Sequence, residues 1–432
     1  MMPVRVSEKM TQLIVIQNVW RCEDNPLLQS AEDKEKMDTI IIGNVNARYH
    51  HDAYGFPERS PDFIRFNLAS ALEMSQYFFQ QTSYRIPIFC HETSDLLQQL
   101  ITQLSITHCR VEQPMAIHEI QILNRLQQQF PQLAIEEVLC DTLFTPEELQ
   151  FKKTVFQKSF THFRKKLEAQ SLTINLANQP LDVSQLKPYP PSLIPIPAVV
   201  EAEPLDCILF QPGEQAAKER LNYYLTGSHC IKTYKETRNG LLGFDFSSKL
   251  SPWLAHGTLS PKRVIVAIED YEEEYGANES TYWLKFELLW REFFKHAMLY
   301  QPRAFFLFKG IQDHPPSTSN NTQGFEHWIN GTTAHDFVNA NMVELKQTGY
   351  MSNRGRQIVA SYLVNELNHD WRMGAYHFQA QLIDYDVSSN WCNWAYLAGV
   401  GHDPRKRHFN IDKQQHSYDP DHAYIDHWLE KR

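Results

Sequence analysis

An acid, an aromatic ring and a cation lie close together in the second half of the sequence. Glu287, Trp290 and Arg291 are spaced three and four residues apart in a strongly periodic segment, so on a helix they share one face. Side chains of these three kinds on one face could bind a ligand together. A surface Glu–Arg pair beside a core tryptophan is the alternative, and the spacing alone does not separate the two.

A second polar group opens another periodic segment. Asn353 and Arg356 are three residues apart at the start of a predicted helix. Polar side chains at such a start suit a phosphate or a ring edge, because the free backbone N–H groups and the helix dipole favour anions there. Ordinary N-capping by Ser352 or Asn353 is the alternative.

A third group contains two acids and an amide. Asp384 and Asp386 are two residues apart, and Asn390 follows four residues later. A metal site would need a histidine or a third carboxylate nearby, and this segment has neither. We therefore predict no metal site and expect these acids to accept hydrogen bonds from a ribose or from a ring N–H group.

Hydroxyl groups and a cation precede a proline turn in a fourth group, which contains Ser247, Ser248, Lys249 and Ser251. Together with Arg356 they could hold a pyrophosphate without a glycine loop. Only Gly43 and Gly55 precede residue 213, which excludes both glycine-rich phosphate-binding motifs from the first half.

Two different patterns divide the chain into regions that could position these groups. Apolar runs at 13–16, 39–42, 86–89 and 134–139 predict buried strands, and the spacing at 63–79 and 117–130 predicts helices between them. This alternation indicates an α/β, Rossmann-like domain with a parallel sheet at 11–140. Residues 141–212 are predicted to be an interdomain linker, with six prolines between 188 and 204. Helical spacing then predicts an all-α domain at 213–432, with helices at 215–224, 261–275, 282–299, 354–367 and 371–383.

Composition restricts the setting of the protein. The 432 residues are 42% hydrophobic and 21% charged, and no apolar run approaches the roughly 18 residues of a transmembrane helix. The N-terminus lacks the apolar segment of a secretory signal. The seven scattered cysteines form no C-x-x-C pair, which argues against disulfides and metal clusters and favours a cytoplasmic, reducing compartment. We expect a monomer without membrane contact.

The net charge of −10 argues against a protein that coats nucleic acid by bulk charge, so any such site must be a local patch. Residues 403–413 carry four cations against two acids, and these cations are Arg405, Lys406, Arg407 and Lys413. A solvated loop is the alternative interpretation.

In this order and spacing, the segments closely resemble the photolyase/cryptochrome family, and within it the DASH cryptochromes. The likeness is dense over 215–428 and thinner over 12–165. The stretches that carry it are YKETRNG at 234–240, SSKLSPWLA at 247–255, FELLWR at 286–291, TGYMSNRGRQ at 348–357, LNHDWRMGA at 367–375, DYD at 384–386 and GVGHDPR at 399–405.

The resemblance implies a flavoprotein that binds FAD in its helical domain. Residues matching the family's cofactor contacts are Tyr234, Ser247, Ser248, Lys249, Leu250, Ser251, Glu287, Arg291, Asn353, Arg356, Asp384, Asp386 and Asn390. Asn390 matches the residue that faces flavin N5, where an amide can donate or accept a hydrogen bond.

The resemblance also implies an enzyme that repairs cyclobutane pyrimidine dimers, preferentially in single-stranded DNA. Light-excited reduced flavin gives an electron to a flipped-out dimer and receives it back after the ring opens. Glu287 would hydrogen-bond the thymine. The residues matching lesion and DNA contacts are Arg238, Trp290, Arg354, Tyr396 and Gln414. Tyr396 stands where double-strand photolyases carry a second tryptophan clamp, which favours single strands.

Light-driven reduction of the flavin is implied to use a chain of tryptophans. Trp394 and Trp371 match its inner and middle members, whereas Thr318 occupies the position of the outer one. The N-terminal domain is implied to house an antenna pigment, usually a folate such as 5,10-methenyltetrahydrofolate, near Glu112 or Glu119.

A blue-light sensor without significant repair is the alternative function. The sequence ends four residues after Trp428, without the long tail of many signalling cryptochromes, and this favours repair.

Overall fold

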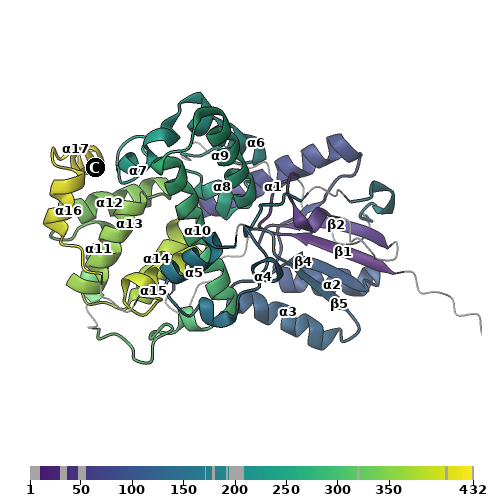
Figure 1. The fold of residues 1–432 in the computed structure, drawn as a ribbon. Coiled ribbons are helices and arrows are strands. Elements are labelled where there is room, and N and C mark those ends of the chain that lie inside the picture. The colour runs from purple at the N-terminus through teal and green to yellow at the C-terminus, as the bar shows by residue number, and fades with distance from the viewer. Residues whose placement is uncertain are drawn as a thin grey trace, which may run out of the picture.

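The computed structural model describes residues 10–29, 37–46, 55–170, 172–177, 181–190, 193, 209–318, 322–403 and 407–430. An α/β region and a helical region lie side by side along its long direction (Figure 1).

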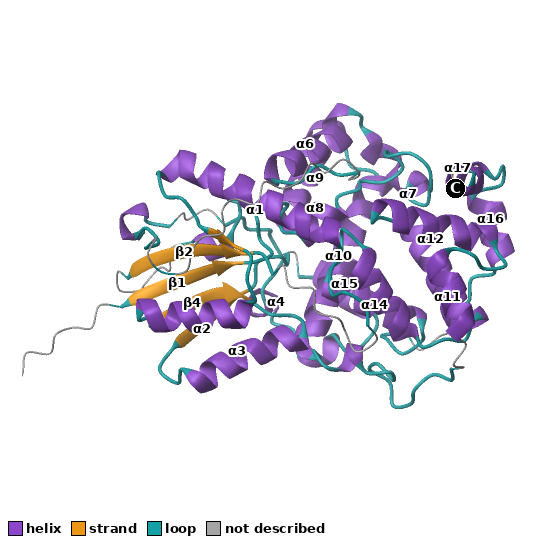
Figure 2. Cartoon of the chain, turned by 180° about the vertical axis from the view of Figure 1, so that it is seen from behind, coloured by secondary structure: helices purple, strands orange, loops and turns teal. Residues whose placement is uncertain are grey.

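Five parallel strands form one sheet in the order β3-β2-β1-β4-β5, with β1 at Thr11–Ile16, β2 at Asp38–Asn44, β3 at Ile88–Phe89, β4 at His108–Glu112 and β5 at Ala134–Val138. Figure 2 shows the sheet between helix α1 (Pro61–Thr82) and the pair α2 (Thr93–Leu104) and α3 (Ile117–Gln129). Leu13 and Val15 belong to the apolar cluster that contains α2, while Ile14 and Ile16 belong to the one that contains α1. Successive side chains of a strand point to opposite faces, so both faces of the sheet are covered. The predicted α/β fold with a parallel sheet is confirmed.

Two elements of this region were not predicted, namely α2 and the interior strand β4. β4 lacks a continuous apolar run because it contains Arg110, whose guanidinium donates to the carbonyl oxygens of Gln29 at 2.6 Å and Pro26 at 2.9 Å. A charged residue with backbone partners can occupy a strand interior that periodicity would assign elsewhere. β3 is also shorter than the predicted 86–89, and β5 ends at Val138 rather than at residue 139.

The segment predicted as a linker contains short helices in its first part: α4 (Pro146–Leu149), η2 (Lys153–Val155), α5 (Phe160–Glu168) and η3 (Val183–Gln185). Phe160 and Phe163 of α5 are buried and pack on α10 (Glu279–Tyr300). Most of the predicted proline-rich stretch lies outside the described residues.

The second half is helical, and its described residues contain no strand. Its further elements are α6 (Glu214–Asn222), η4 (Tyr223–Gly227), η5 (Cys230–Thr233), α7 (Tyr234–Thr237), α8 (Ser251–Ala255), α9 (Pro261–Tyr275), η6 (Ala304–Phe306), α11 (Thr322–Asn330), α12 (Asp336–Thr348), α13 (Asn353–Ser361), η7 (Tyr362–Glu366), α14 (Trp371–Gln381), α15 (Val387–Leu397), α16 (Ile411–Tyr418) and α17 (Ala423–Leu429). The predicted all-α second half is confirmed. None of the helices described combines the length and apolar content that crossing a bilayer requires.

Buried polar contacts join the two regions. The guanidinium of Arg21, which follows β1, donates to the carbonyl oxygens of Gly257 at 2.8 Å and Cys140 at 2.6 Å. The carboxylate of Glu292 on α10 accepts hydrogen bonds from the backbone N–H groups of Leu143 and Phe144, at 2.7 and 3.0 Å. These contacts fix the segment after β5 against α10.

Candidate functional site

A cavity of about 200 Å³ lies among α8, α13, α14 and α15. Its lining includes many of the residues selected from the sequence, namely Ser251, Asn353, Arg356, Asp384, Asp386, Asn390 and Trp394. Tyr350, Gln357, Phe378 and Tyr385 also line it. The cavity therefore combines a cation, carboxylates, amides, a hydroxyl and flat aromatic rings.

An ion pair closes one wall of this cavity. Arg356 Nη2 lies 2.9 and 2.7 Å from the two carboxylate oxygens of Asp384, and the Ser251 hydroxyl donates to the same carboxylate at 2.6 Å. Ser352, rather than Asn353, caps α13, because its hydroxyl oxygen accepts from the Gly355 N–H at 3.0 Å. Ser352 therefore fills the N-capping role that was the alternative interpretation of this segment, and Asn353 does not.

Asp386 forms a second wall and begins α15. One carboxylate oxygen accepts from the backbone N–H of Ser389 at 2.7 Å, as expected of an N-cap, and the other accepts from Lys295 Nζ at 2.5 Å. Lys295 also pairs with Asp141, which precedes α4. Burial alone would raise the pKa of Asp386 and Asp141, but the charges of Lys295 and Arg291 hold the pKa of both carboxyls below the usual value.

Arg291, expected to contact the cofactor, is directed to this network and does not line the cavity. Its guanidinium donates to the Asp141 carboxylate at 3.1 Å and to the Leu254 carbonyl at 3.3 Å. Arg291 thus joins the segment after β5 to α8, one element of the cavity wall.

Asn390 and Trp394 lie one turn apart on α15 and face α14. Asn390 Nδ2 donates to the Ala375 carbonyl at 3.0 Å, which orients its amide. A Cβ atom at Gly374 of α14 would come within 2.2 Å of the Trp394 ring, so only glycine permits this approach of the two helices.

The hydroxyl-rich segment before α8 divides into a lining residue and supporting residues. Ser251 lines the cavity, whereas the backbone carbonyls of Ser247 and Ser248 accept hydrogen bonds from Arg220 at 3.1 and 2.9 Å. Leu250 is buried and is the N-cap of α8.

Lys249, expected to contact a phosphate, does not line the cavity, and its ammonium packs against two aromatic rings. Its backbone adopts a left-handed conformation with φ of 57°, and its ammonium lies 4.0 Å from the ring centroid of Phe246 and 4.3 Å from that of Tyr350. Burial lowers the pKa of Lys249 to about 8. Its side chain therefore supports Tyr350, which lines the cavity.

A second group lies between α7 and α10, outside this cavity lining. Arg238 forms an ion pair with Glu287, and burial raises the pKa of Glu287 although Arg238 opposes that effect. Tyr234 is buried beside this pair. Trp290 follows Glu287 on α10, and its ring centroid lies 5.7 Å from that of Tyr396 on α15.

The remaining residues expected to contact DNA lie together on α13 and α16. Arg354 donates to the side-chain oxygens of Asn239 at 3.0 Å and Gln414 at 3.4 Å, and its guanidinium lies 4.5 Å from the ring centroid of Tyr418. Within the predicted basic patch, Arg405 and Lys406 lie outside the described residues. Arg407 pairs with Asp403 at 2.6 Å.

A separate pocket opens at the carboxyl ends of β1, β2 and β4, where the strand order of the sheet reverses. Glu112 ends β4 and accepts from the backbone N–H groups of Gln17 and Asn18 at 2.7 and 2.8 Å. Burial raises the pKa of Glu112 to about 7. Glu119 also lines this pocket and accepts from the Ala116 N–H at 3.1 Å, so both candidate antenna acids lie in one pocket.

Two residues of the cavity region were not predicted from the sequence. Gln357 lines the cavity, and its Oε1 is a buried atom without a hydrogen-bond partner among the described residues. Gln357 follows Arg356 directly at the start of the same helix, and this position is the sequence signal that could have identified it. Lys295 lies four residues after Arg291 on the same face of α10.

The donor set of the cavity fits FAD. Arg356, Ser251 and Asn353 offer groups for phosphate and ribose, and Trp394 and Phe378 offer flat surfaces for a ring system. The unpartnered oxygen of Gln357 could accept a hydrogen bond from a bound group.

Comparison with known proteins agrees with this chemistry. One family model, described as DNA photolyase, matches residues 13–185, and another, described as FAD binding domain of DNA photolyase, matches residues 283–431. The cryptochrome DASH of Idiomarina loihiensis is 40% identical over 96% of this chain and 92% of its own length. The chain belongs to the photolyase/cryptochrome family. The cryptochrome DASH of Danio rerio is 36% identical over 98% of this chain and 84% of its own length.

Solved structures share the photolyase/cryptochrome fold. A cryptochrome from Synechocystis sp. superposes with a TM-score of 0.84 at 33% identity, covering 97% of this chain and 88% of its own. An archaeal photolyase from Sulfolobus tokodaii gives a TM-score of 0.75 at 23% identity, covering 98% and 90%. The predicted family is confirmed, and the matched FAD-binding domain contains the cavity-lining helices α13, α14 and α15.

The tryptophans of this photolyase/cryptochrome chain form two contacts around the cavity. The Trp394 ring lies 6.2 Å from that of the buried Trp328, and the Trp371 ring lies 5.9 Å from that of Trp391. Thr318, at the position of the family's outer tryptophan, is exposed.

Proposed function

We propose that this protein is a light-driven lyase that repairs cyclobutane pyrimidine dimers, preferentially in single-stranded DNA. The observation that carries the proposal is the pairing of Trp290 with Tyr396 beside Glu287. Tyr396 lies on the same helix as Asn390 and Trp394, so a base held between α10 and α15 would be close to the FAD-binding cavity. Bound FAD, when reduced and excited by blue light, supplies the electron that opens the dimer.

The residues around this position supply binding and orientation. A flipped pyrimidine dimer would contact Tyr396 and the face of Trp290 that Phe160 does not cover, and Glu287 offers a carboxyl group to its polar edge. Because Glu287 is half-buried and its pKa is raised, its carboxyl could donate as well as accept a hydrogen bond. Arg238 and Arg354 would contact phosphates next to the lesion.

Repair of a defined substrate tests the proposal. The purified protein, with its FAD chemically reduced, is illuminated with a single-stranded thymine oligomer that carries one cyclobutane dimer, and the remaining dimer is measured. We expect light-dependent loss of the dimer, faster in the single strand than in the matching duplex. A protein that binds FAD and responds to light without removing the dimer would support the sensor function instead.

We propose in addition that the pocket beside Glu112 binds a folate antenna, 5,10-methenyltetrahydrofolate. The pocket lies at the reversal of strand order, a common ligand position in open parallel sheets. It also shares Asn18, Arg59 and Glu112 with a smaller cavity that reaches Asp386, so a pigment there would be close to the FAD cavity. The purified protein is mixed with this folate and unbound folate is removed by gel filtration. Near-ultraviolet absorption that stays with the protein, and that is lost in Glu112→Ala, would support the assignment.

A further inference from the structure

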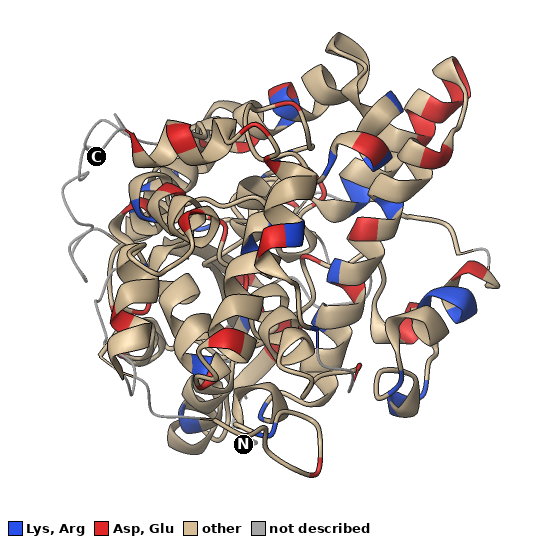
Figure 3. Cartoon of the chain, turned by 90° about the vertical axis from the view of Figure 1, so that its left-hand side faces the viewer, with Lys and Arg blue, Asp and Glu red and all other residues tan. Residues whose placement is uncertain are grey.

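A basic segment precedes and includes α5. Residues 152–166 contain six cations and no Asp or Glu, in a chain whose net charge is −10; these cations are Lys152, Lys153, Lys158, Arg164, Lys165 and Lys166. All five lysines are exposed. Over the helical region seen end-on in Figure 3, by contrast, cationic and acidic residues are mixed.

Aromatic packing fixes the orientation of the basic segment. Phe160 stacks on Trp290 with ring centroids 3.8 Å apart and an interplanar angle of 15°. Phe163 packs on Phe293 at 5.4 Å. Since the phenylalanines point towards α10, the lysines of the segment point to solvent.

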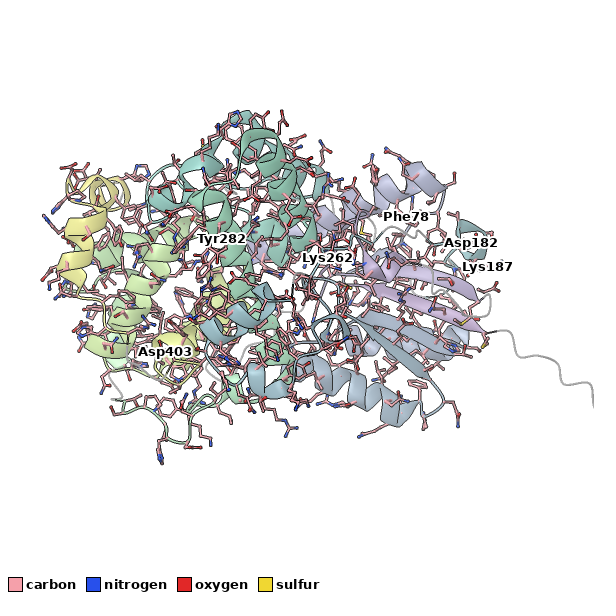
Figure 4. All side chains as sticks on the ribbon, viewed as in Figure 1. Phe78, Asp182, Lys187, Lys262, Tyr282 and Asp403 are labelled. Atoms are coloured by element: carbon pink, nitrogen blue, oxygen red, sulfur yellow. The ribbon has the colours of Figure 1, made fainter. Side chains whose placement is uncertain are left out.

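The basic segment follows α10 over most of its length. Near one end of α10, Arg164 donates to the hydroxyl of Tyr282, which is labelled in Figure 4. Near the other end, the ammonium of Lys153 lies 5.6 Å from the ring centroid of Tyr300. Eighteen residues of helix span about 27 Å, a length that fits several nucleotides, and Trp290 lies near the middle.

Cations also lie on the opposite side of the Glu287–Trp290 face. The ammonium of Lys235 on α7 lies 5.1 Å from the ring centroid of Trp283, and Arg238 pairs with Glu287. Glu287 and Trp290 therefore lie between two cationic borders, α7 on one side and the basic segment on the other.

We propose that the basic segment binds the phosphate backbone of a single-stranded nucleic acid whose base reaches Trp290. The proposal rests on the proposed function and names a surface outside the helical domain that this function uses. Proteins that bind single strands without sequence preference place lysines beside aromatic rings. The cations contact the phosphates along the backbone, and the rings stack on bases. Trp290 and Trp283 are half-buried between these cations, a position that a base of an extended strand can enter but the flat surface of a bilayer cannot.

Neutralising three exposed lysines tests the surface. The variant K152Q/K158Q/K165Q leaves Arg164 and the packing of Phe160 intact. We expect its affinity for an undamaged oligothymidylate to fall about tenfold or more at low salt. The slope of log K against log salt should decrease by about 2, since each phosphate contact to a single strand contributes about 0.7.

Matched variants separate position from total charge. K187Q/K309Q/K346Q removes three exposed lysines elsewhere, and Lys187 lies at the opposite end of the molecule from Tyr282 in Figure 4. This control should bind with the parent affinity and slope. K152R/K158R/K165R keeps the charge and should bind like the parent, while FAD absorption and melting temperature show that each variant is folded.

The outcomes distinguish this inference from the proposed function. If the parent binds the oligomer and K152Q/K158Q/K165Q binds it equally well, the basic segment is not the backbone site, and the repair proposal stands. A parent that binds no single strand would overturn both. Stronger binding of the parent to vesicles with anionic lipids than to the oligomer, abolished in the same variant, would assign the surface to a membrane and overturn the inference.

Discussion

Arg356 and Asp384 form a two-oxygen ion pair in the wall of the FAD-binding cavity, with Nη2 at 2.9 and 2.7 Å from the carboxylate oxygens. The side chain of Asp384 is only 1% exposed, so its charge depends on Arg356 and on the hydroxyl of Ser251 for compensation. The pair joins the start of α13 to the turn before α15. Its integrity should therefore determine both stability and FAD content.

We expect Arg356→Ala to lower the free energy of unfolding by about 3 kcal/mol, because it leaves the buried carboxylate of Asp384 without a partner. The FAD-to-protein absorbance ratio should fall as well. The double variant R356A/D384N also removes the negative charge of Asp384. It should therefore regain much of the lost melting temperature without regaining FAD. Full FAD content in Arg356→Ala would contradict the role of this pair in the cavity.

Lys295 lies between two carboxylates that come from different regions of the chain. Removing its charge by Lys295→Met should destabilise the protein by about 3 kcal/mol at neutral pH, since the buried Asp386 would lose its ion-pair partner and Asp141 would keep only Arg291. In the parent, the lowered pKa values of these acids give stability that is present above about pH 4 and lost at lower pH. The raised pKa of Lys295 gives stability that is lost only when the pH rises above about 10.5.

The pH dependence provides the check on this network. In Lys295→Met, the carboxylates that have lost Lys295 can become protonated. The difference in the free energy of unfolding from the parent should therefore shrink as the pH falls from 8 towards 5. Urea unfolding of both proteins at several pH values measures it. Lys295→Arg, which keeps the charge, should show a much smaller loss, and an equal loss at pH 5 and pH 8 in Lys295→Met would point to packing instead.

Part of the cavity lining could be grouped from the sequence because its residues are local. Asn353 and Arg356 share a helix start, and Asp384, Asp386 and Asn390 lie within seven residues, but their assignment to a cofactor came from the family resemblance and not from spacing. The sequence pattern predicted the parallel sheet from its apolar runs. It did not find β4, because Arg110 interrupts the apolar pattern and donates to carbonyl groups distant in sequence.

Relationships between distant residues could not be predicted from spacing. Phe160 stacks on Trp290, which follows it by 130 residues in the sequence. Lys295 pairs with Asp141, which precedes it in the chain, and with Asp386, which follows it. Arg291 was expected to contact the cofactor because of its position in the motif. Its guanidinium instead forms an ion pair with the carboxylate of Asp141. The contacts of Phe160 and Asp141 follow from the docking of the segment after β5 on α10.

Glu287→Ala should lower dimer repair while FAD remains bound, because Glu287 lies outside the cavity lining. Loss of one positioned hydrogen bond to the lesion costs about 1–3 kcal/mol, which corresponds to roughly a tenfold to hundredfold slower repair. Repair yield per absorbed photon, measured with chemically reduced protein, is the readout. Glu273→Ala on α9 is the control, since Glu273 is exposed. An unchanged yield in Glu287→Ala would remove this residue from the mechanism.

Glu112 should give the protein a pH dependence near neutrality. Burial raises its pKa from an ordinary value near 4.5 to about 7, so folding favours the protonated form. Its contribution therefore lowers stability as the pH rises from about 4.5 through 7. Glu112→Gln should flatten the change in melting temperature between pH 5 and 8. An unaltered profile in this variant would show that Glu112 titrates normally in the folded protein.

Light-driven reduction should depend on Trp394, which lines the FAD-binding cavity. We expect Trp394→Phe to abolish photoreduction of bound FAD in the oxidised protein while leaving repair by chemically reduced protein intact, because repair needs only the reduced cofactor. Because the family resemblance places Thr318 at the position of the outer tryptophan, we expect the path beyond Trp394 to end differently from that of three-tryptophan relatives. Trp328 contacts Trp394 directly, and Trp371 contacts Trp391, whose ring lies 4.8 Å from that of Tyr376.

Two single variants decide between these paths. If the electron comes through Trp371, Trp371→Phe should slow photoreduction strongly and Trp328→Phe should have little effect, whereas the opposite result assigns the path to Trp328. Transient absorption of the oxidised protein with an external reductant measures both, and FAD absorbance confirms that the cavity is intact. Efficient photoreduction that survives in both Trp394→Phe and Trp371→Phe would exclude the family's route in this chain, because electron transfer would then bypass the two positions that match it.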